Sequence, residues 1–328
     1  MGRRDSRSPN PDGTLMIAFI LRRLGAGIVT VATLCVLAFF LLYVGATDTA
    51  RNIVGQSASA EIVARKAAEL GIDKPLIIQF GDWLGHVMAG DLGRSWFSGE
   101  PVVQTLAVRV PVTLSITIGA TLVSGLLAVL LGALAAGRRG WLDRTIQVGS
   151  VIAAAVPGFL FALALATVFG LMLRWLPATG YISASKSITG WLSTVTLPII
   201  ALAIGATAGV AQQVRGSMID VLRMDYVRTL RSRGLPTRRV VYGHVLRNAA
   251  GPALGVLGLQ FVIVFGGAVI IEQVFSLPGI GQAAVKATTQ GDLPVVMGVV
   301  IVTAILVVLV NLAIDLLQGW LNPKVRLS

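Results

Sequence analysis

Six long runs of uncharged, mostly apolar residues limit what this chain of 328 residues can fold into. A bilayer core about 30 Å thick requires roughly 20 residues of helix to cross it, and each run reaches that length. The runs are continuously apolar rather than alternating with a period of two, which favours helices over the strands of a membrane barrel. The sequence therefore predicts an all-α membrane protein with six transmembrane helices. The predicted spans are residues 24–44, 110–137, 145–173, 187–214, 248–271 and 293–314.

The basic residues follow membrane topology and do not indicate a nucleic-acid partner. The formal net charge is +12, yet 18 of the 27 Lys and Arg residues fall on one side if both termini and the second and fourth connections are cytoplasmic. Cytoplasmic loops are enriched in Lys and Arg in this way. The pattern predicts a multi-pass protein with its N- and C-termini in the cytoplasm.

Hydropathy and charge also divide the chain into segments. A small extracytoplasmic lid is predicted after the first helix, with a helix over 60–70 that ends at Gly71. Trp83 and Trp96 are expected near the lipid headgroups. Pro157 lies inside the third span and should kink it. The predicted segments are an N-terminal tail 1–23, a first transmembrane helix 24–45, the lid 46–109, a five-helix core 110–318 containing the connection 215–247, and a C-terminal tail 319–328.

No residues of the chain form a recognisable catalytic, cofactor or metal site. The segment from Gly279 to Lys286 lacks the second glycine of a phosphate-binding loop, so the sequence predicts that this chain binds no ATP. His86 and His244 fall on opposite sides of the membrane in the predicted topology, which excludes a shared metal site. Cys35 is the single cysteine and is expected to be a packing residue.

Ionisable residues are absent from the middle of every predicted span. Those near span ends are Arg109, Arg174, Glu272 and Asp315, and their side chains are expected to extend to the membrane interface. Ion-coupled carriers usually carry ionisable groups at membrane depth. The pattern disfavours such a carrier, although backbone carbonyls can also bind ions, so this class stays open. An intramembrane enzyme would need a nucleophile–base pair or a metal cluster, and none is found.

The connection 215–247 is unusually long and cationic for a link between two spans. It carries eight arginines. The pattern is compatible with a helix from Val214 to Val227, a break at Gly234 and a second helical run from Pro236 through Val245. A topological signal needs only a few arginines. The rest of this segment therefore suggests a rigid protrusion that another protein grips.

At this point the chain resembles the permeases of ABC importers, in particular the B-type permease of the dipeptide, oligopeptide and nickel family. The match covers nearly the whole chain, and the motifs occur in the right order. They are LGIDKPL (70–76), GDLGRS (90–95), RVPVTL (109–114), WLPATGY (175–181), DYVRTLRSRGL (225–235), HVLRNA (244–249), EQVFSLPGIG (272–281) and NPKVR (322–326).

The resemblance implies a fold of the type I ABC importer kind, in which the segment 225–235 is the helix that docks into an ATPase subunit. Gly234 would supply its turn. The residues expected to make the ATPase contact are Asp225, Tyr226, Val227, Arg228, Thr229, Leu230, Arg231, Arg233, Gly234 and Leu235. The residues expected to contact a substrate-binding protein are Asp91, Arg94, Trp96, Phe275, Pro278 and Gly279.

The resemblance also implies an assembly in a bacterial inner membrane. Its partners would be a second, homologous permease, two ATPase subunits that bind ATP and Mg²⁺, and an extracytoplasmic binding protein. The chain would form half of a pathway for di- or oligopeptides, with nickel chelates or another small solute as the alternative within the family. Two departures stand out: Leu230 replaces the usual alanine and should enlarge the docking face, and the usual Pro-Gly after the first span is missing around 45–48.

Overall fold

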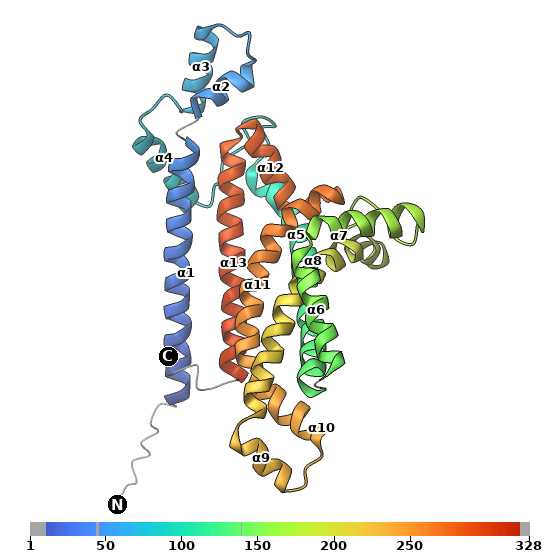
Figure 1. Ribbon diagram of the computed structural model, residues 1–328. Coiled ribbons are helices and arrows are strands. Elements are labelled where there is room, and N and C mark those ends of the chain that lie inside the picture. Colours follow the sequence, from blue (N-terminus) through green and yellow to red (C-terminus); the bar gives the residue numbers. More distant parts are fainter. Residues whose placement is uncertain (1–10, 44–45, 139, 322–328) are drawn as a thin grey trace, which may run out of the picture.

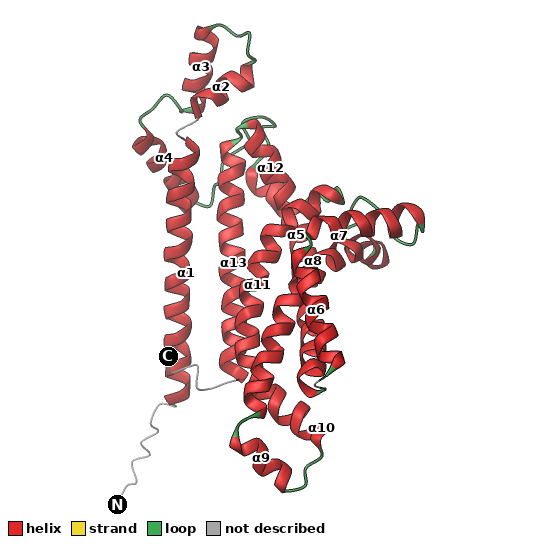
Figure 2. Cartoon of the chain, viewed as in Figure 1, coloured by secondary structure: helices red, strands yellow, loops and turns green. Residues whose placement is uncertain are grey.

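The computed structural model describes residues 11–43, 46–138 and 140–321. These residues are overwhelmingly helical (Figure 2), and the only β pairing among them is one isolated bridge between Arg94 and Pro101. The prediction of an all-α protein is confirmed. The ends of the two predicted tails, 1–10 and 322–328, lie outside the described residues.

Thirteen α-helices and two π-helical segments make up the described part of the chain. They are α1 (Pro11–Tyr43), α2 (Ala46–Val54), α3 (Ala60–Leu70), α4 (Leu76–Met88), α5 (Val102–Gly137), α6 (Trp141–Ala155), α7 (Gly158–Leu165), η1 (Ala166–Met172), α8 (Ile188–Leu222), α9 (Asp225–Ser232), α10 (Thr237–Arg239), η2 (Val240–Val245), α11 (Leu246–Val274), α12 (Ile280–Gln290) and α13 (Leu293–Leu321).

The long helices α5, α8, α11 and α13 run side by side as a bundle, with α1 against α13 on one flank (Figure 1). The most extensive packing joins α5 to α8. Small side chains permit this close contact, since Ala133 and Ala136 of α5 are buried in one cluster with Ala211 of α8. Because α9 and α10 lie at one end of the bundle and α12 at the other, we call these the α9 end and the α12 end.

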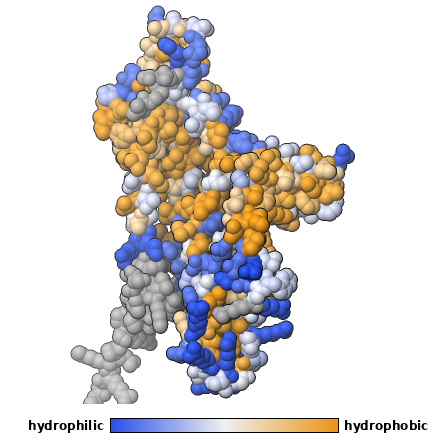
Figure 3. Space-filling view, viewed as in Figure 1, coloured by the Kyte–Doolittle hydropathy of each residue, from blue (hydrophilic) through white to orange (hydrophobic). Residues whose placement is uncertain are grey.

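Five of the described helical stretches are long and apolar enough to cross a membrane. Hydrophobic side chains cover the middle of the molecule, and hydrophilic ones gather around α9 (Figure 3). The five stretches are Ile20–Tyr43, Val102–Gly137, Ile188–Leu222, Thr237–Val274 and Leu293–Gly319. They correspond to five of the six predicted spans.

The remaining predicted span, the third in chain order (residues 145–173), is broken rather than kinked. α6 and the α7–η1 pair meet at an angle of 93°, and the α7–η1 pair projects sideways from the bundle (Figure 1). Pro157 has no N–H and forces the preceding Val156 into an extended conformation (φ −82°, ψ 124°), so the helix ends there. The kink predicted at Pro157 is therefore a complete break of the helix, with a bend of 93°.

This broken segment lies between α5 and α8, both of which terminate at the α9 end (Figure 1). Counted as one bent span, it brings the candidate membrane crossings among the described residues to six, the number that the hydropathy pattern predicts.

Helix boundaries elsewhere also differ from the prediction. α1 already begins at Pro11, inside the predicted tail 1–23. α8 ends at Leu222 rather than continuing to Val227. After α11 the chain forms the further helix α12, whose end is marked by Gly291 in the left-handed region (φ 77°).

The predicted lid consists of α2, α3 and α4 beyond the α12 end of α1 (Figure 1). The expected helix over 60–70 is confirmed as α3, which ends at Gly71 (φ 71°). Aromatic side chains attach the lid to α1: the Trp83 ring lies 5.4 Å from that of Phe39, and Trp96 lies 6.3 Å from Tyr43. Such ring contacts add to the apolar area that holds the lid in place.

Candidate functional sites at the two ends of the bundle

The short helix α9 projects from the α9 end between α8 and α11. The chain turns at Arg223 and Met224 after α8, forms α9, and returns through α10 and η2 into α11 (Figure 1). The elements that flank α9 therefore lead directly into two helices of the bundle. This placement agrees with the protrusion predicted for residues 215–247.

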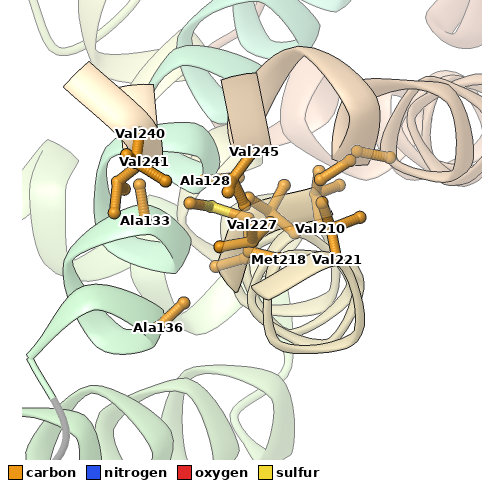
Figure 4. Packing of buried hydrophobic residues seen from close by; sticks show 14 residues of the cluster. Ala128, Ala133, Ala136, Val210, Met218, Val221, Val227, Val240, Val241 and Val245 are labelled. Atoms are coloured by element: carbon orange, nitrogen blue, oxygen red, sulfur yellow. The ribbon is translucent and has the colours of Figure 1, made fainter. Parts of the chain in front are cut away.

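The inner face of α9 is anchored in the core of the bundle. Val227 is 0% exposed and packs among buried side chains of α8 and η2 (Figure 4). Tyr226 and Leu230 pack against the same cluster while remaining partly exposed. The Tyr226 hydroxyl also accepts a hydrogen bond of 3.0 Å from Nδ2 of Asn248 in α11. A displacement of α9 must therefore move α8, η2 and α11 with it. The buried side chains of the cluster are Ala128, Ala133, Ala136, Val210, Ala211, Val214, Met218, Val221, Val227, Val240, Val241, Val245, Ala249 and Ala253.

This anchor bears on two expectations about individual residues. Val227 lies in the segment expected to contact an ATPase, but its side chain is enclosed by the chain's own core and holds α9 in position. Leu230 packs against the same core while part of its side chain stays exposed, so its expected enlargement of a docking face stays a prediction.

The outer face of α9 and the turn after it are cationic. Arg228, Arg231 and Arg233 are all exposed. Within the described residues only Arg228 has a carboxylate neighbour, Asp225, at 3.7 Å, and these two side chains are 80% and 96% exposed. Ion pairs this exposed contribute little free energy. The outer face therefore offers positive charge to a partner with a complementary surface.

Gly234 ends α9 in a left-handed conformation, with φ of 79°. Its N–H donates to the carbonyl of Arg231 (2.9 Å), and the N–H of Leu235 donates to the carbonyl of Leu230 (3.3 Å). These bonds close the last turn of the helix, and glycine is the residue that adopts this conformation at least cost. Gly234 therefore fixes the angle between α9 and the returning chain, as predicted.

At the α12 end, the last turn of α11 buries a carboxylate. Glu272 is 0% exposed and accepts hydrogen bonds from the Thr113 hydroxyl of α5 (2.5 Å) and from the N–H of Gln282 in α12 (2.9 Å). The Thr113 oxygen in turn accepts the N–H of Ile280 (2.8 Å). We call Thr113, Glu272, Ile280 and Gln282 the carboxylate junction. It joins α5, α11 and the start of α12.

The prediction that Glu272 extends to the membrane interface is wrong. A carboxylate can be buried only when hydrogen-bond donors replace water, and the hydroxyl of Thr113 and the first turn of α12 supply them. The other span-end residues behave differently. Asp315 forms an ion pair with Arg23 (3.2 Å), and Arg109 donates to the carbonyl of Gly279 (3.4 Å).

Gly281 permits the close contact that closes this junction. A β-carbon at this position would lie 2.7 Å from the Cα of Val269 in α11, closer than such atoms approach in proteins. Only a hydrogen atom fits there, so α12 can lie directly against α11. The glycines of the segment 272–281 thus have a packing reason that the motif alone does not reveal.

The loop between α11 and α12 turns its apolar side chains inward. Phe275 is 1% and Leu277 is 0% exposed. The carbonyl of Phe275 accepts the N–H of Gly180 (3.0 Å), which connects this loop to the segment 175–181. Of the three contact candidates here, Phe275 and Gly279 are therefore buried by the chain itself, and Pro278 is half-buried.

The three contact candidates in the segment 91–96 are more accessible. Asp91 and Arg94 are exposed, and Trp96 is half-buried. The segment is held by Asp292, which is 3% exposed and accepts hydrogen bonds from the Ser95 hydroxyl and from the N–H of Trp96 (3.1 Å). Sequence reasoning missed Asp292 as well as Glu272. An acidic residue directly before or after an apolar span, next to a glycine-rich turn, was the available signal.

No group of three His, Cys, Asp or Glu side chains within the described ranges is placed to hold a metal ion. His86 lies in α4 and His244 in η2, at opposite ends of the bundle, as predicted. Cys35 is buried in α1, which confirms its role as a packing residue.

Comparison with known proteins identifies the family. Residues 128–327 match the family described as binding-protein-dependent transport system inner membrane component, and residues 16–117 match the N-terminal segment of such membrane components. The chain belongs to this family. Membership agrees with the all-helical fold of the described residues.

The similar proteins are matched over almost their full length. A Brucella melitensis protein described as a peptide transport system permease is 36% identical over 313 residues, which cover 95% of this chain and 99% of that protein. A Sinorhizobium fredii protein described as a peptide ABC transporter permease is 36% identical over 312 residues, covering 95% of this chain and 100% of the relative. The glutathione transport system permease protein GsiC of Salmonella typhimurium is 34% identical over 312 residues, covering 95% and 99%.

Proposed function

We propose that this chain is the permease subunit of an ATP-driven, binding-protein-dependent importer of di- or oligopeptides. Its family supports the transport role. The names of its relatives support the solute class, since two refer to peptides and one to glutathione, which is a tripeptide. Nickel chelates are the alternative within the family, and none of these names favours them.

The proposed orientation puts the α9 end in the cytoplasm of a bacterial cell and the lid outside the inner membrane. The N-terminal end of α1 and the C-terminal end of α13 lie toward the α9 end (Figure 1), so both termini would be cytoplasmic. The connections at this end carry Arg138, Arg144 and the eight arginines of 215–247. This distribution supports the orientation through the positive-inside rule.

The observation that carries the proposal is the difference between the two faces of α9. Its arginine-bearing face is open, while Val227 fixes the opposite face in the bundle. A separate ATPase subunit that binds the open face and moves would transmit its motion to α8 and α11. Two ATPase subunits would act on this chain and on a homologous second permease. Their motion would switch the transport pathway between a state open to one side of the membrane and a state open to the other. A binding protein would deliver the solute at the α12 end.

Site-specific crosslinking tests the ATPase contact. In a Cys35→Ser background, which removes the single native cysteine, we expect Arg231→Cys in the assembled transporter to crosslink to an ATPase subunit. The matched control is Thr289→Cys, an exposed position of α12 at the opposite end. We expect the control to react with a reagent added from outside the cell and to form no ATPase crosslink. An ATPase crosslink at Thr289 but not at Arg231 would contradict the proposal.

The energy source separates the proposal from an ion-coupled carrier. We expect the purified chain alone to hydrolyse no ATP, and the complete transporter in proteoliposomes to import peptide only when ATP is present inside the ATPase-facing compartment. Dissipation of proton and sodium gradients should leave this uptake unchanged. ATP hydrolysis by the isolated chain, or uptake by gradients alone, would overturn the proposed division of labour.

A further inference from the structure

A cavity of about 430 Å³ opens at the α9 end, between the last turns of α5 and the chain that returns from α9. Its lining combines apolar side chains with arginines, a hydroxyl and a tyrosine. We call it the headgroup cavity, and its lining residues are Ala133, Leu134, Gly137, Arg138, Thr237, Arg238, Val241 and Tyr242.

The charge of the headgroup cavity is uncompensated by the residues that surround it. Arg138 and Arg238 are both exposed, and no Asp or Glu residue lines the cavity. Among the ion pairs formed by described residues, none includes either arginine. Two guanidinium groups at one cavity are suited to a phosphate, to which arginine can donate two parallel hydrogen bonds.

The depth of the cavity indicates which phosphate compound reaches it. Arg138 follows Gly137 directly, where the apolar helix α5 ends. Trp141, just beyond, is 77% exposed, and Tyr242 at the cavity is 53% exposed. Exposed Trp and Tyr side chains concentrate at the level of lipid headgroups. The apolar side chain of Leu134 at the cavity is partly exposed. A free phosphate ion would leave it uncovered, whereas the glycerol and upper acyl chains of a lipid would cover it.

We propose that the headgroup cavity binds an anionic phospholipid, with Arg138, Arg238 and the Thr237 hydroxyl as donors to its phosphate. Basic pockets between membrane helices recognise anionic headgroups in this way. Arg138 belongs to the end of α5 and Arg238 to the chain returning from α9. The bound lipid therefore joins the bundle to the segment that positions α9. The inference depends neither on the transported solute nor on which side of the membrane the α9 end faces.

Native mass spectrometry of the full chain tests this proposal. The chain is reconstituted into nanodiscs that contain equal amounts of phosphatidylglycerol and phosphatidylcholine, released, and its retained lipid is measured. We expect phosphatidylglycerol to be retained in preference to phosphatidylcholine. The preference should fall about fivefold for each arginine removed, and roughly 25-fold in the double variant Arg138→Gln/Arg238→Gln.

The matched control is Arg144→Gln/Arg247→Gln. It removes two exposed arginines from the same end of the molecule, and neither lines the headgroup cavity. We expect it to keep the preference for phosphatidylglycerol. Equal losses in both double variants would show a general charge effect and would overturn the site. The single variant Arg238→Gln, in an exposed connection outside the bundle, provides the same comparison if the double variant fails to fold.

A second measurement distinguishes the lipid from free phosphate. The detergent-solubilised, delipidated chain is melted with inorganic phosphate, with phosphatidylglycerol dissolved in the same detergent, or with neither. We expect only phosphatidylglycerol to raise the melting temperature, and the increase to disappear in Arg138→Gln/Arg238→Gln. An equal increase with inorganic phosphate, or no preference between the two phospholipids in nanodiscs, would overturn the proposal.

Discussion

Replacing Gly234 with valine is expected to lower peptide uptake at least about tenfold while the chain still inserts into the membrane. Gly234 has φ of 79°, and an L-residue with a β-carbon loses roughly 1–2 kcal/mol in this region, with more for a β-branched one. The chain relieves this strain by changing the turn that orients α9. Because the ATPase subunits would still hydrolyse ATP, the measurement is uptake by proteoliposomes per ATP hydrolysed.

Two further variants separate backbone conformation from bulk. Gly234→Asn should retain most of the coupling, because asparagine tolerates the left-handed region. Gly243→Val adds the same side chain in η2, where the backbone is helical and no atom beyond the adjoining helix backbone lies within 4 Å of the new β-carbon, and it should transport normally. If Gly234→Val also transported normally, α9 would not need its fixed angle and the proposed coupling would be wrong.

Replacing Thr113 with valine is expected to destabilise the chain by about 2–4 kcal/mol. The substitution nearly conserves volume but removes the hydroxyl that donates to Glu272 and accepts from Ile280. Leaving a buried donor or acceptor without a partner costs about 1–3 kcal/mol for each group, and more when a charge is involved. The carboxylate junction should therefore open, and α12 should lose its attachment to α5.

Thr117→Val is the matched control for this experiment. Thr117 is also fully buried, one turn further along α5, but its hydroxyl bonds only to the carbonyl of Thr113 in the same helix. Its removal should cost about 1 kcal/mol or less. Cys35 provides the measurement, because the only thiol in the chain is buried and reacts with a fluorogenic maleimide when the protein unfolds. Equal labelling temperatures for the two variants would show that the junction contributes no stability.

The main architecture could be predicted from the sequence because bilayer thickness imposes a simple rule. Five uninterrupted apolar runs became five long helices, although some extend well beyond the predicted ends: the helix predicted from residue 110 begins at Val102, and the one predicted to end at residue 214 ends at Leu222. α3 was equally predictable, since its apolar spacing ends at Gly71. In each case one local signal, hydropathy or a helix stop, determined the outcome.

Features that depend on tertiary contacts could not be predicted in this way. A proline inside an apolar run predicts a bend, but the 93° angle at Pro157 depends on how α7 and α8 pack. Glu272 lies at the end of an apolar run, where an exposed position is the usual outcome. Its burial depends on Thr113, which lies 159 residues earlier in the chain. No local pattern encodes such a partnership.

The segment around α9 shows both situations. Its arginines, its glycine break and its place between two spans were evident in the sequence, and the structure confirms the protrusion. The sequence alone could not show which side chains anchor α9 and which are available to a partner. Val227 and Leu230 look like surface residues of a short amphipathic helix until α8 and η2 are placed around them. Motif resemblance shows where such a segment lies, but it does not show which of its side chains face the core and which face a partner.

The right-angled break between α6 and α7 bears on how the ribosome delivers this chain to the lipid bilayer. α6 has 15 residues and extends about 22 Å as a helix, which is shorter than the roughly 30 Å that a crossing requires. α7 and η1 together have a similar length, so neither half can be inserted as a separate crossing. We therefore expect the translocation machinery to release both halves as one straight stretch. The bend would then form only after synthesis of α8, which packs against both α6 and α7.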